Sequence, residues 1–171
     1  RGESLRSIER ALDLGVNLFD TCPSYGNSEE ILGEAFKGRR DRVIISTKIR
    51  GSNLDSIPTS VEHSLGRLRT DFIDVLQLRD PTPQRVDAYE VLENMDALKR
   101  QGKIRFGSVT IGDNRLTEQG LYSIEKGFDT IQLAYNMVFR DAAESVLPQA
   151  RAAGVGILGR GPLCKGFLTS R

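Results

Sequence analysis

The stretch VNLFDTCPSYGNSEEILGE, residues 16–34, has the pattern of a strand, a loop and the first turns of a helix. Its first five residues form a short apolar run that ends at Asp20, and a loop with a single tyrosine, Tyr25, follows. An apolar run of this length, bounded by polar residues, is typical of a buried strand. The rest of the stretch has helical spacing, and Gly38 follows as a stop. The stretch therefore predicts a β/α unit whose strand ends in a carboxylate.

The same unit recurs along the chain. Six apolar runs rich in Val, Ile, Leu and Phe begin 25 to 32 residues apart, at 16–20, 42–48, 72–79, 104–110, 130–136 and 155–160. Runs this continuous are typical of parallel strands that are covered on both faces. The segments between them carry apolar residues at helical spacing, and a glycine ends most of them. The sequence therefore predicts a single α/β domain over residues 1–171.

Two architectures contain such repeated units: a doubly wound open sheet and a (β/α)8 barrel of the TIM type. The segment GVGILG, residues 154–159, matches the G-x-G-x-x-G pattern that would support the open sheet. It follows a helix and runs along a strand, whereas a phosphate-binding loop links a strand to a helix. We therefore read Gly154 as a helix cap and expect a (β/α)8 TIM-barrel type, with about six of the eight β/α units present.

Composition argues against several classes of function. The chain of 171 residues has 24 Lys and Arg against 23 Asp and Glu, a balance that argues against nucleic acid or a membrane surface as a partner. No apolar run is long enough to span a bilayer. The two cysteines, Cys22 and Cys164, cannot build a disulfide framework, which suits a reducing compartment. We expect a cytoplasmic protein without a metal site.

Polar residues end all six predicted strands: Asp20, Lys48, Arg79, Thr110, Asn136 and Arg160. In β/α folds the chemistry gathers at this end of the strands. A lysine in apolar surroundings needs a counter-ion, which Asp20 on the neighbouring strand can supply to Lys48. A nearby ammonium also makes a phenol a stronger acid, so Tyr25 could donate a proton to a developing alkoxide. From the residues alone, a structural salt bridge beside a packing tyrosine is the alternative.

Six segments resemble, in order, the motifs of the aldo-keto reductase superfamily. FDTCPSYGNSEEILGEA is similar to the family's F-D-T-A-x-x-Y-G-x-S-E-x-x-L-G-x-A signature, and SLGRLRTDFIDVLQL to its S-L-x-R-L-x-T-D-Y-I-D-L-x-x-L-H motif. RVIISTK resembles the strand of the catalytic lysine, and GKIRFGSVT, QLAYN and PLCKGFLT resemble three further motifs. The match covers essentially the whole chain. It implies a (β/α)8 barrel that binds NADPH without a Rossmann domain and reduces a small-molecule carbonyl compound.

The resemblance also implies roles for individual residues. Tyr25 corresponds to the family's proton-donating tyrosine, Lys48 to the lysine that makes this tyrosine a stronger acid, and Asp20 to the partner of that lysine. Gln132 corresponds to the residue that binds the nicotinamide carboxamide, and Arg160 falls where many members stack a tyrosine on the nicotinamide ring. The expected cofactor contacts are Asp20, Thr110, Gln132, Arg160, Gly161 and Leu163.

Arg79 is the main departure from the family's pattern, which has a histidine at this position. An arginine donates hydrogen bonds but is always charged, so it cannot relay a proton. We expect Arg79 to add a third charge beside Lys48 and Asp20 and to orient or polarise the carbonyl. The sole histidine, His63, is expected on the solvent face of a helix. Arg79 leaves two alternatives open: non-redox acid–base chemistry such as elimination or isomerisation, and a non-catalytic cofactor-sensing or scaffolding role.

Two further departures concern the cofactor and the barrel. Thr110-Ile111 stands where the family has Ser-Asn, so an amide that usually meets the nicotinamide is missing. Relative to the family, the first strand and the last strand with its helix are not represented. An open parallel barrel exposes two strand edges. We therefore expect that a longer chain, or self-association with a second copy, completes the barrel.

Overall fold

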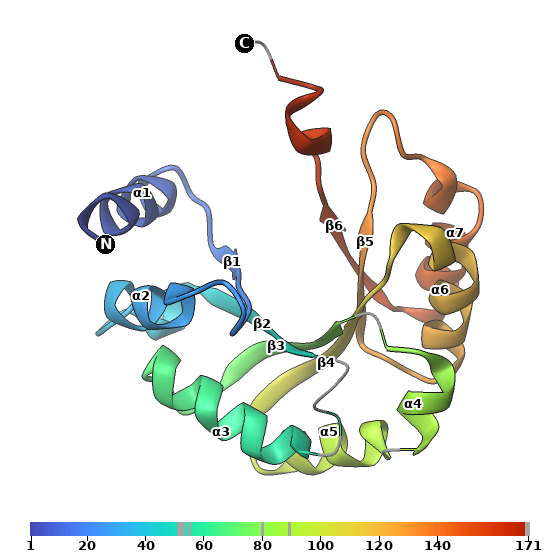
Figure 1. Cartoon of the computed structure of the whole chain (residues 1–171), viewed down its shortest axis with the longest axis horizontal. Coiled ribbons are helices and arrows are strands. Elements are labelled where there is room, and N and C mark those ends of the chain that lie inside the picture. Colours follow the sequence, from blue (N-terminus) through green and yellow to red (C-terminus); the bar gives the residue numbers. More distant parts are fainter. Residues whose placement is uncertain (51–53, 55, 80, 89, 170–171) are drawn as a thin grey trace.

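The apolar runs form six parallel strands in this computed structural model, which describes residues 1–50, 54, 56–79, 81–88 and 90–169. The strands are β1 (Leu18–Asp20), β2 (Ile44–Arg50), β3 (Ile73–Arg79), β4 (Ile104–Thr110), β5 (Thr130–Ala134) and β6 (Gly156–Arg160). Each pairs with the next one along the chain, and the sheet curls into an open arc with β1 and β6 at its edges (Figure 1). The described strands thus form part of a (β/α)8 TIM barrel, as the sequence predicts.

Helices connect the strands and cover the convex side of the arc (Figure 1). They are α1 (Gly2–Asp13), α2 (Ser28–Ala35), α3 (Ile57–Leu68), α4 (Pro83–Ala88), α5 (Val91–Arg100), α6 (Leu116–Glu125) and α7 (Val146–Ala153). The sequence pattern predicts all of these except α4, whose six residues are too few to show a periodic apolar stripe. None of the helices in the described part of the chain has the length and apolarity that a membrane crossing requires.

Two strands end at other residues than the apolar pattern predicts. β2 continues beyond Lys48 to Arg50, because its backbone still pairs with β3 there: Lys48 lies opposite Gln77, and Arg50 lies opposite Arg79. β5 ends at Ala134 rather than at position 136, opposite the last residue of β6. Lys48 therefore lies one pleat inside the carboxyl end of its strand, and an arginine occupies the end.

The glycine-rich segment 154–159 is no phosphate-binding loop. Gly154 has a φ of 71° and caps α7, and Gly156 and Gly159 lie within β6. The reading of Gly154 as a helix cap is thus confirmed. The sequential order of the strands also excludes the doubly wound sheet, in which the strand order reverses at a switch point.

The two faces of the sheet have different surroundings. Because successive strand residues point to opposite faces, Ile45, Leu76 and Ile131 pack against the helices and are fully buried. Residues of the opposite pleat face the concave side, where Leu18 and Phe106 remain 36% and 42% exposed. The apolar core therefore lies between sheet and helices, and the concave face is open at the carboxyl ends of the strands.

Candidate functional site

Lys48 and Asp20 form an ion pair at the concave face, as the sequence predicts. The lysine ammonium donates to Oδ2 of Asp20, and also to the backbone oxygen of Thr21 at 3.0 Å. The side chain of Lys48 is only 3% exposed, whereas that of Asp20 is 31% exposed. A buried ammonium requires such partners, because its charge is costly to remove from water. The pair fixes Lys48 between β1 and β2.

Tyr25 lies on the loop after β1 and faces the same ammonium. The Nζ atom of Lys48 is 5.8 Å from the centroid of the Tyr25 ring, close enough for a cation–π contact. Tyr25 is 50% exposed, and its hydroxyl makes no hydrogen bond to any residue in the described ranges. The loop therefore presents a phenol whose ring contacts the ammonium and whose hydroxyl is open to a ligand.

Gln77, which the sequence reasoning missed, occupies the position expected for Arg79. Its amide nitrogen donates to Oδ1 of Asp20 at 2.8 Å and to the hydroxyl of Ser46. It is fully buried in the middle of β3, opposite Lys48. The signal that could have found it is a glutamine inside the apolar run IDVLQL, on the same pleat as the strand's last residue.

Thr110 and Gln132 continue this polar row across β4 and β5. The hydroxyl of Thr110 lies within hydrogen-bond distance of the amide oxygen of Gln77 and 3.3 Å from that of Gln132. Thr110 and Gln132 are also paired in the strand register. Side chains from five adjacent strands thus form one polar row on the concave face: Asp20, Lys48, Gln77, Thr110 and Gln132.

Arg79, expected as a third charge beside Lys48 and Asp20, ends β3 at the rim of the site. It lies one pleat further along β3, opposite Arg50 and Thr110, and it is exposed. Its guanidinium makes one side-chain contact in the described residues, from Nη1 to the hydroxyl of Ser24 at 3.4 Å. The strand pairs Lys48 with Gln77, which places Arg79 at the rim, one pleat beyond the Asp20–Lys48 pair.

Arg160 lies at the other end of the row and is tied to the loop after β4. Its guanidinium forms an ion pair with Asp113 and donates to the backbone oxygen of Ile111 at 3.1 Å. Gly161, with a φ of 66°, turns the chain after β6, and its carbonyl accepts from Asn136 at 2.9 Å. Leu163 follows in the same loop and is 56% exposed.

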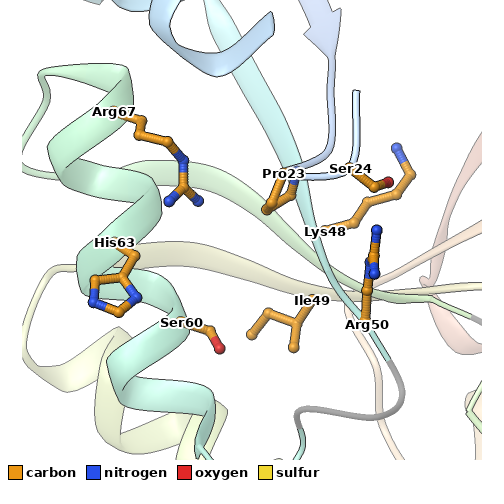
Figure 2. A pocket seen from close by; sticks show the side chains of 8 residues that line it. All are labelled: Pro23, Ser24, Lys48, Ile49, Arg50, Ser60, His63 and Arg67. Atoms are coloured by element: carbon orange, nitrogen blue, oxygen red, sulfur yellow. The ribbon is translucent and has the colours of Figure 1, made fainter. Parts of the chain in front are cut away.

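A pocket of about 280 Å³ adjoins Lys48 on the side of α3. Its walls are the loop after β1, the end of β2 and one face of α3 (Figure 2): Pro23, Ser24, Lys48, Ile49, Arg50, Ser60, His63 and Arg67. His63 lies on the exposed face of α3, as the sequence predicts, and also lines this pocket. None of the eight lining residues carries a carboxylate, and four carry basic side chains.

Several polar groups in the row or beside it have no partner among the described residues and could hold a ligand such as a nicotinamide cofactor. The amide nitrogen of Gln132 makes no hydrogen bond to a described residue, although the residue is only 7% exposed. The hydroxyl of Ser108 and the Nε atom of Arg160 are buried without a partner among the described residues. Buried polar groups are normally paired, so such orphans fit a site that a polar ligand completes. The backbone at Gly161 lies in open space, which suits the close approach of a phosphate.

Comparison with known proteins agrees with the fold and with the geometry of the site. The sequence model of the Aldo/keto reductase family matches residues 1–171. The chain is 38% identical over 182 residues to "Aldo-keto reductase YhdN" of Bacillus subtilis, covering 98% of this chain and 54% of that protein. The chain thus spans little more than half the length of that curated relative.

Two solved structures share the fold. The apo form of aldo-keto reductase AKR11C1 from Bacillus halodurans superposes with a TM-score of 0.83 at 31% identity, covering 99% of this chain and 58% of that one. An aldo/keto reductase from Klebsiella pneumoniae, solved in complex with NADP and acetate, gives a TM-score of 0.83 at 27% identity, with coverage of 97% and 60%.

Proposed function

Because this chain belongs to the aldo/keto reductase family, we propose that it is an NADPH-dependent oxidoreductase that reduces a small aldehyde or ketone to an alcohol. The observation that carries the proposal is the ammonium of Lys48, which Asp20 and Thr21 hold on one side while the Tyr25 ring faces it at 5.8 Å. A structural salt bridge alone gives no reason for an adjacent tyrosine whose hydroxyl is open to a ligand.

Tyr25 is the proposed proton donor. Its Oη gives a proton to the carbonyl oxygen as that oxygen gains negative charge, and the resulting phenolate is stabilised by the Lys48 ammonium. The carboxylate of Asp20 neutralises the lysine and holds it against the backbone oxygen of Thr21. The lysine therefore keeps a fixed position through the reaction, and no reorganisation is needed when the phenolate forms.

NADPH, when bound, supplies the hydride that reduces the carbonyl carbon. The residues proposed to hold it come from the polar row, from the end of β6 and from the loop after it: Asp20, Thr110, Gln132, Arg160, Gly161 and Leu163. The free amide nitrogen of Gln132 is suited to the carboxamide oxygen. Ile111, which replaces an amide of the family's pattern, is fully buried and provides its backbone oxygen to Arg160 instead.

Arg79 is proposed to take over the orienting role of the family's histidine. Its exposed guanidinium at the rim can donate to a carbonyl oxygen and stabilise developing negative charge. It cannot relay protons, so Tyr25 alone must deliver them. An Arg79→His variant that turns over much faster would show that Arg79 impairs the reductase, whereas a loss would show that Arg79 has a role of its own.

Titration of the full-length protein with NADPH, followed by cofactor fluorescence, tests the proposal. We expect saturable binding, and oxidation of bound NADPH when members of a panel of aldehydes and ketones are added. An absence of NADPH binding would overturn the reductase proposal. Binding without oxidation by any carbonyl would instead favour a cofactor-sensing protein, the reading to which the exchange of histidine for Arg79 also gives some support.

A further inference from the structure

Two arginines stand side by side at the rim of the site. Arg50 ends β2, Arg79 ends β3, and their Cα atoms are partners in the parallel register. Neighbouring strands lie about 4.8 Å apart, so the two charges leave the sheet at the same level. Like charges directly opposite each other in a sheet are destabilising. The pair therefore destabilises the fold unless a negatively charged group offsets the repulsion between the two arginines.

Neither arginine has a carboxylate partner within the described part of the chain. Among the described residues, the one side-chain hydrogen bond of the pair runs from Arg79 to the hydroxyl of Ser24 at 3.4 Å. Some other arginines have a carboxylate partner, among them Arg67 with Glu29 and Arg160 with Asp113. One unpaired arginine on a surface would be a solvated charge and nothing more. Two in register, beside a candidate reaction centre, indicate a place for an anion.

The position of the pair relates it to the reacting groups. Arg50 and Arg79 follow Lys48 and Gln77 on the same pleat, about 7 Å further along their strands. Ser24, which contacts Arg79, immediately precedes Tyr25. A group bound by the two guanidiniums therefore lies a few bonds away from a carbonyl held at Tyr25.

The adjoining pocket is also lined by basic residues. Ile49 points from β2 towards Ser60 and His63 of α3, whereas the Lys48 and Arg50 side chains line its edge and point away from that helix (Figure 2). Its volume of about 280 Å³ leaves room for more than a single small ion. Hydroxyls of Ser24 and Ser60 add hydrogen-bond donors to its walls. Because Arg67 is paired with Glu29 and Lys48 with Asp20, the arginine pair at the strand ends, and not this pocket, supplies the charge for an anion.

We propose that Arg50 and Arg79 form a subsite for an oxyanion on the substrate, so that the protein prefers carbonyl compounds bearing a carboxylate or phosphate close to the carbonyl carbon. This inference rests on the proposed reductase function. The planar guanidinium presents a fork of donors that matches carboxylate and phosphate oxygens. The bound anion offsets the repulsion of the arginine pair and fixes the carbonyl relative to Tyr25.

Matched pairs of carbonyl probes test the subsite in the full-length protein with NADPH. 4-Carboxybenzaldehyde and 4-formylbenzamide have nearly the same shape and differ by one charge. D-glyceraldehyde 3-phosphate and D-glyceraldehyde form the second pair and separate a preference for phosphate from one for carboxylate. We expect kcat/KM to be about tenfold or more higher for the charged member of at least one pair, mainly through a lower KM, as charge-assisted hydrogen bonds predict.

Variants test whether this preference depends on the arginine pair. Arg50→Gln is expected to reduce the charged-to-neutral ratio of kcat/KM about tenfold, and Arg50→Lys to restore part of it. Arg100→Gln is the matched control, because Arg100 is exposed at the end of α5 and its loss lowers net charge equally. Thermal unfolding of each variant shows whether it is folded. An equal effect of Arg50→Gln and Arg100→Gln would mean that only net charge acts and would overturn the subsite.

The same experiments distinguish a protein without the anion subsite from a protein that is not a reductase. Turnover of charged and neutral probes with equal kcat/KM would leave a reductase without an anion subsite. Lack of turnover of every probe, with NADPH bound, would refute the reductase function. In that case direct titration of each variant with 4-carboxybenzamide, followed by calorimetry, still decides the subsite, since binding that Arg50→Gln does not weaken would refute it.

Discussion

Gln77 donates a hydrogen bond from its amide nitrogen to Oδ1 of Asp20 across 2.8 Å, although the two residues lie on strands separated by β2. The other carboxylate oxygen of Asp20 accepts from Lys48. Both oxygens of the carboxylate are therefore occupied, which holds it in one orientation and fixes the ammonium that faces Tyr25. Gln77 thus helps to position the proposed proton donor, Tyr25, because it acts through Asp20 and Lys48.

Gln77→Met tests this positioning role. Methionine keeps the length of the side chain but leaves Oδ1 of Asp20 and the hydroxyl of Ser46 without a donor. We expect a loss of about 1–3 kcal/mol in the free energy of unfolding, and a fall in kcat/KM that is larger than any rise in the Kd for NADPH. Urea unfolding and steady-state kinetics measure the two effects. Unchanged kinetics at lower stability would restrict Gln77 to a structural role.

Removal of the Asp20–Lys48 pair is expected to affect stability and turnover differently. Lys48→Met leaves the Asp20 carboxylate without its cation, so we expect unfolding to become easier by about 2 kcal/mol, because Asp20 is only partly buried. The double variant Asp20→Asn, Lys48→Met removes both charges and should regain most of that stability without regaining turnover. Urea unfolding of the single and double variants forms the cycle. Recovery of turnover in the double variant would contradict the role of Lys48.

Tyr25→Phe should change turnover and leave stability unaffected. The Tyr25 hydroxyl makes no hydrogen bond to a described residue and the side chain is half exposed, so its removal costs the fold little. The loss of a positioned general acid typically lowers the rate about a hundredfold or more. We expect kcat to fall by that factor while the unfolding midpoint and the NADPH Kd stay close to those of the parent. A variant with nearly full kcat would identify another proton donor.

The architecture and most of the candidate site can be predicted from the sequence for a physical reason. Continuous apolar runs with helical segments between them leave few folds, and strand order follows from short connections. The Asp20–Lys48 pair could be predicted because a buried ammonium needs a counter-ion within reach. Its position one pleat inside the sheet could not, because the apolar pattern does not fix where backbone pairing with β3 stops.

Side-chain register is the part that the sequence leaves undetermined. A shift of two residues between β2 and β3 decides whether Gln77 or Arg79 lies beside Asp20, and both are polar residues on the same pleat. The resemblance to the family directs attention to Arg79, since that position usually carries a histidine. The pairing of Arg50 with Arg79 likewise depends on register and emerges only from the structure.

A pH-dependent contribution to stability is expected at Tyr122, away from the site. Burial, and then the hydrogen bond to Asp87, raise the pKa of Tyr122 to about 12. Its neutral hydroxyl lies 3.2 Å from the Pro83 carbonyl and 3.0 Å from Oδ1 of Asp87, and ionisation would lose the proton that it shares with them.

The folded pKa of Tyr122 is higher than the ordinary value for tyrosine, about 10. The stabilisation is therefore fully present below pH about 10 and is lost as the pH rises towards about 12. The urea midpoint should fall between pH 9 and pH about 11.5. This fall should be larger for the parent than for Tyr122→Phe, whose side chain does not titrate. Equal falls in the two proteins would refute this contribution.

Gly33 in α2 is a position where the addition of one methyl group should destabilise the fold. A Cβ atom added there would lie 2.6 Å from the carbonyl oxygen of Leu68 and 2.7 Å from that of Arg67, at the end of α3. Backbone atoms cannot move aside as a flexible side chain can, so Gly33→Ala should separate the two helices and cost about 1–3 kcal/mol or more. Because α2 follows the loop of Tyr25, turnover should fall as well.

Gly66→Ala is the matched control, within α3 itself. A Cβ at Gly66 meets nothing within 4 Å, and alanine is favoured over glycine inside a helix by about 0.5–1 kcal/mol. The two substitutions are chemically the same, and we expect opposite signs in the free energy of unfolding by urea denaturation. If Gly33→Ala also stabilised the protein, α2 and α3 could not approach as closely as this packing requires, and the position of the Tyr25 loop would have to depend on other contacts.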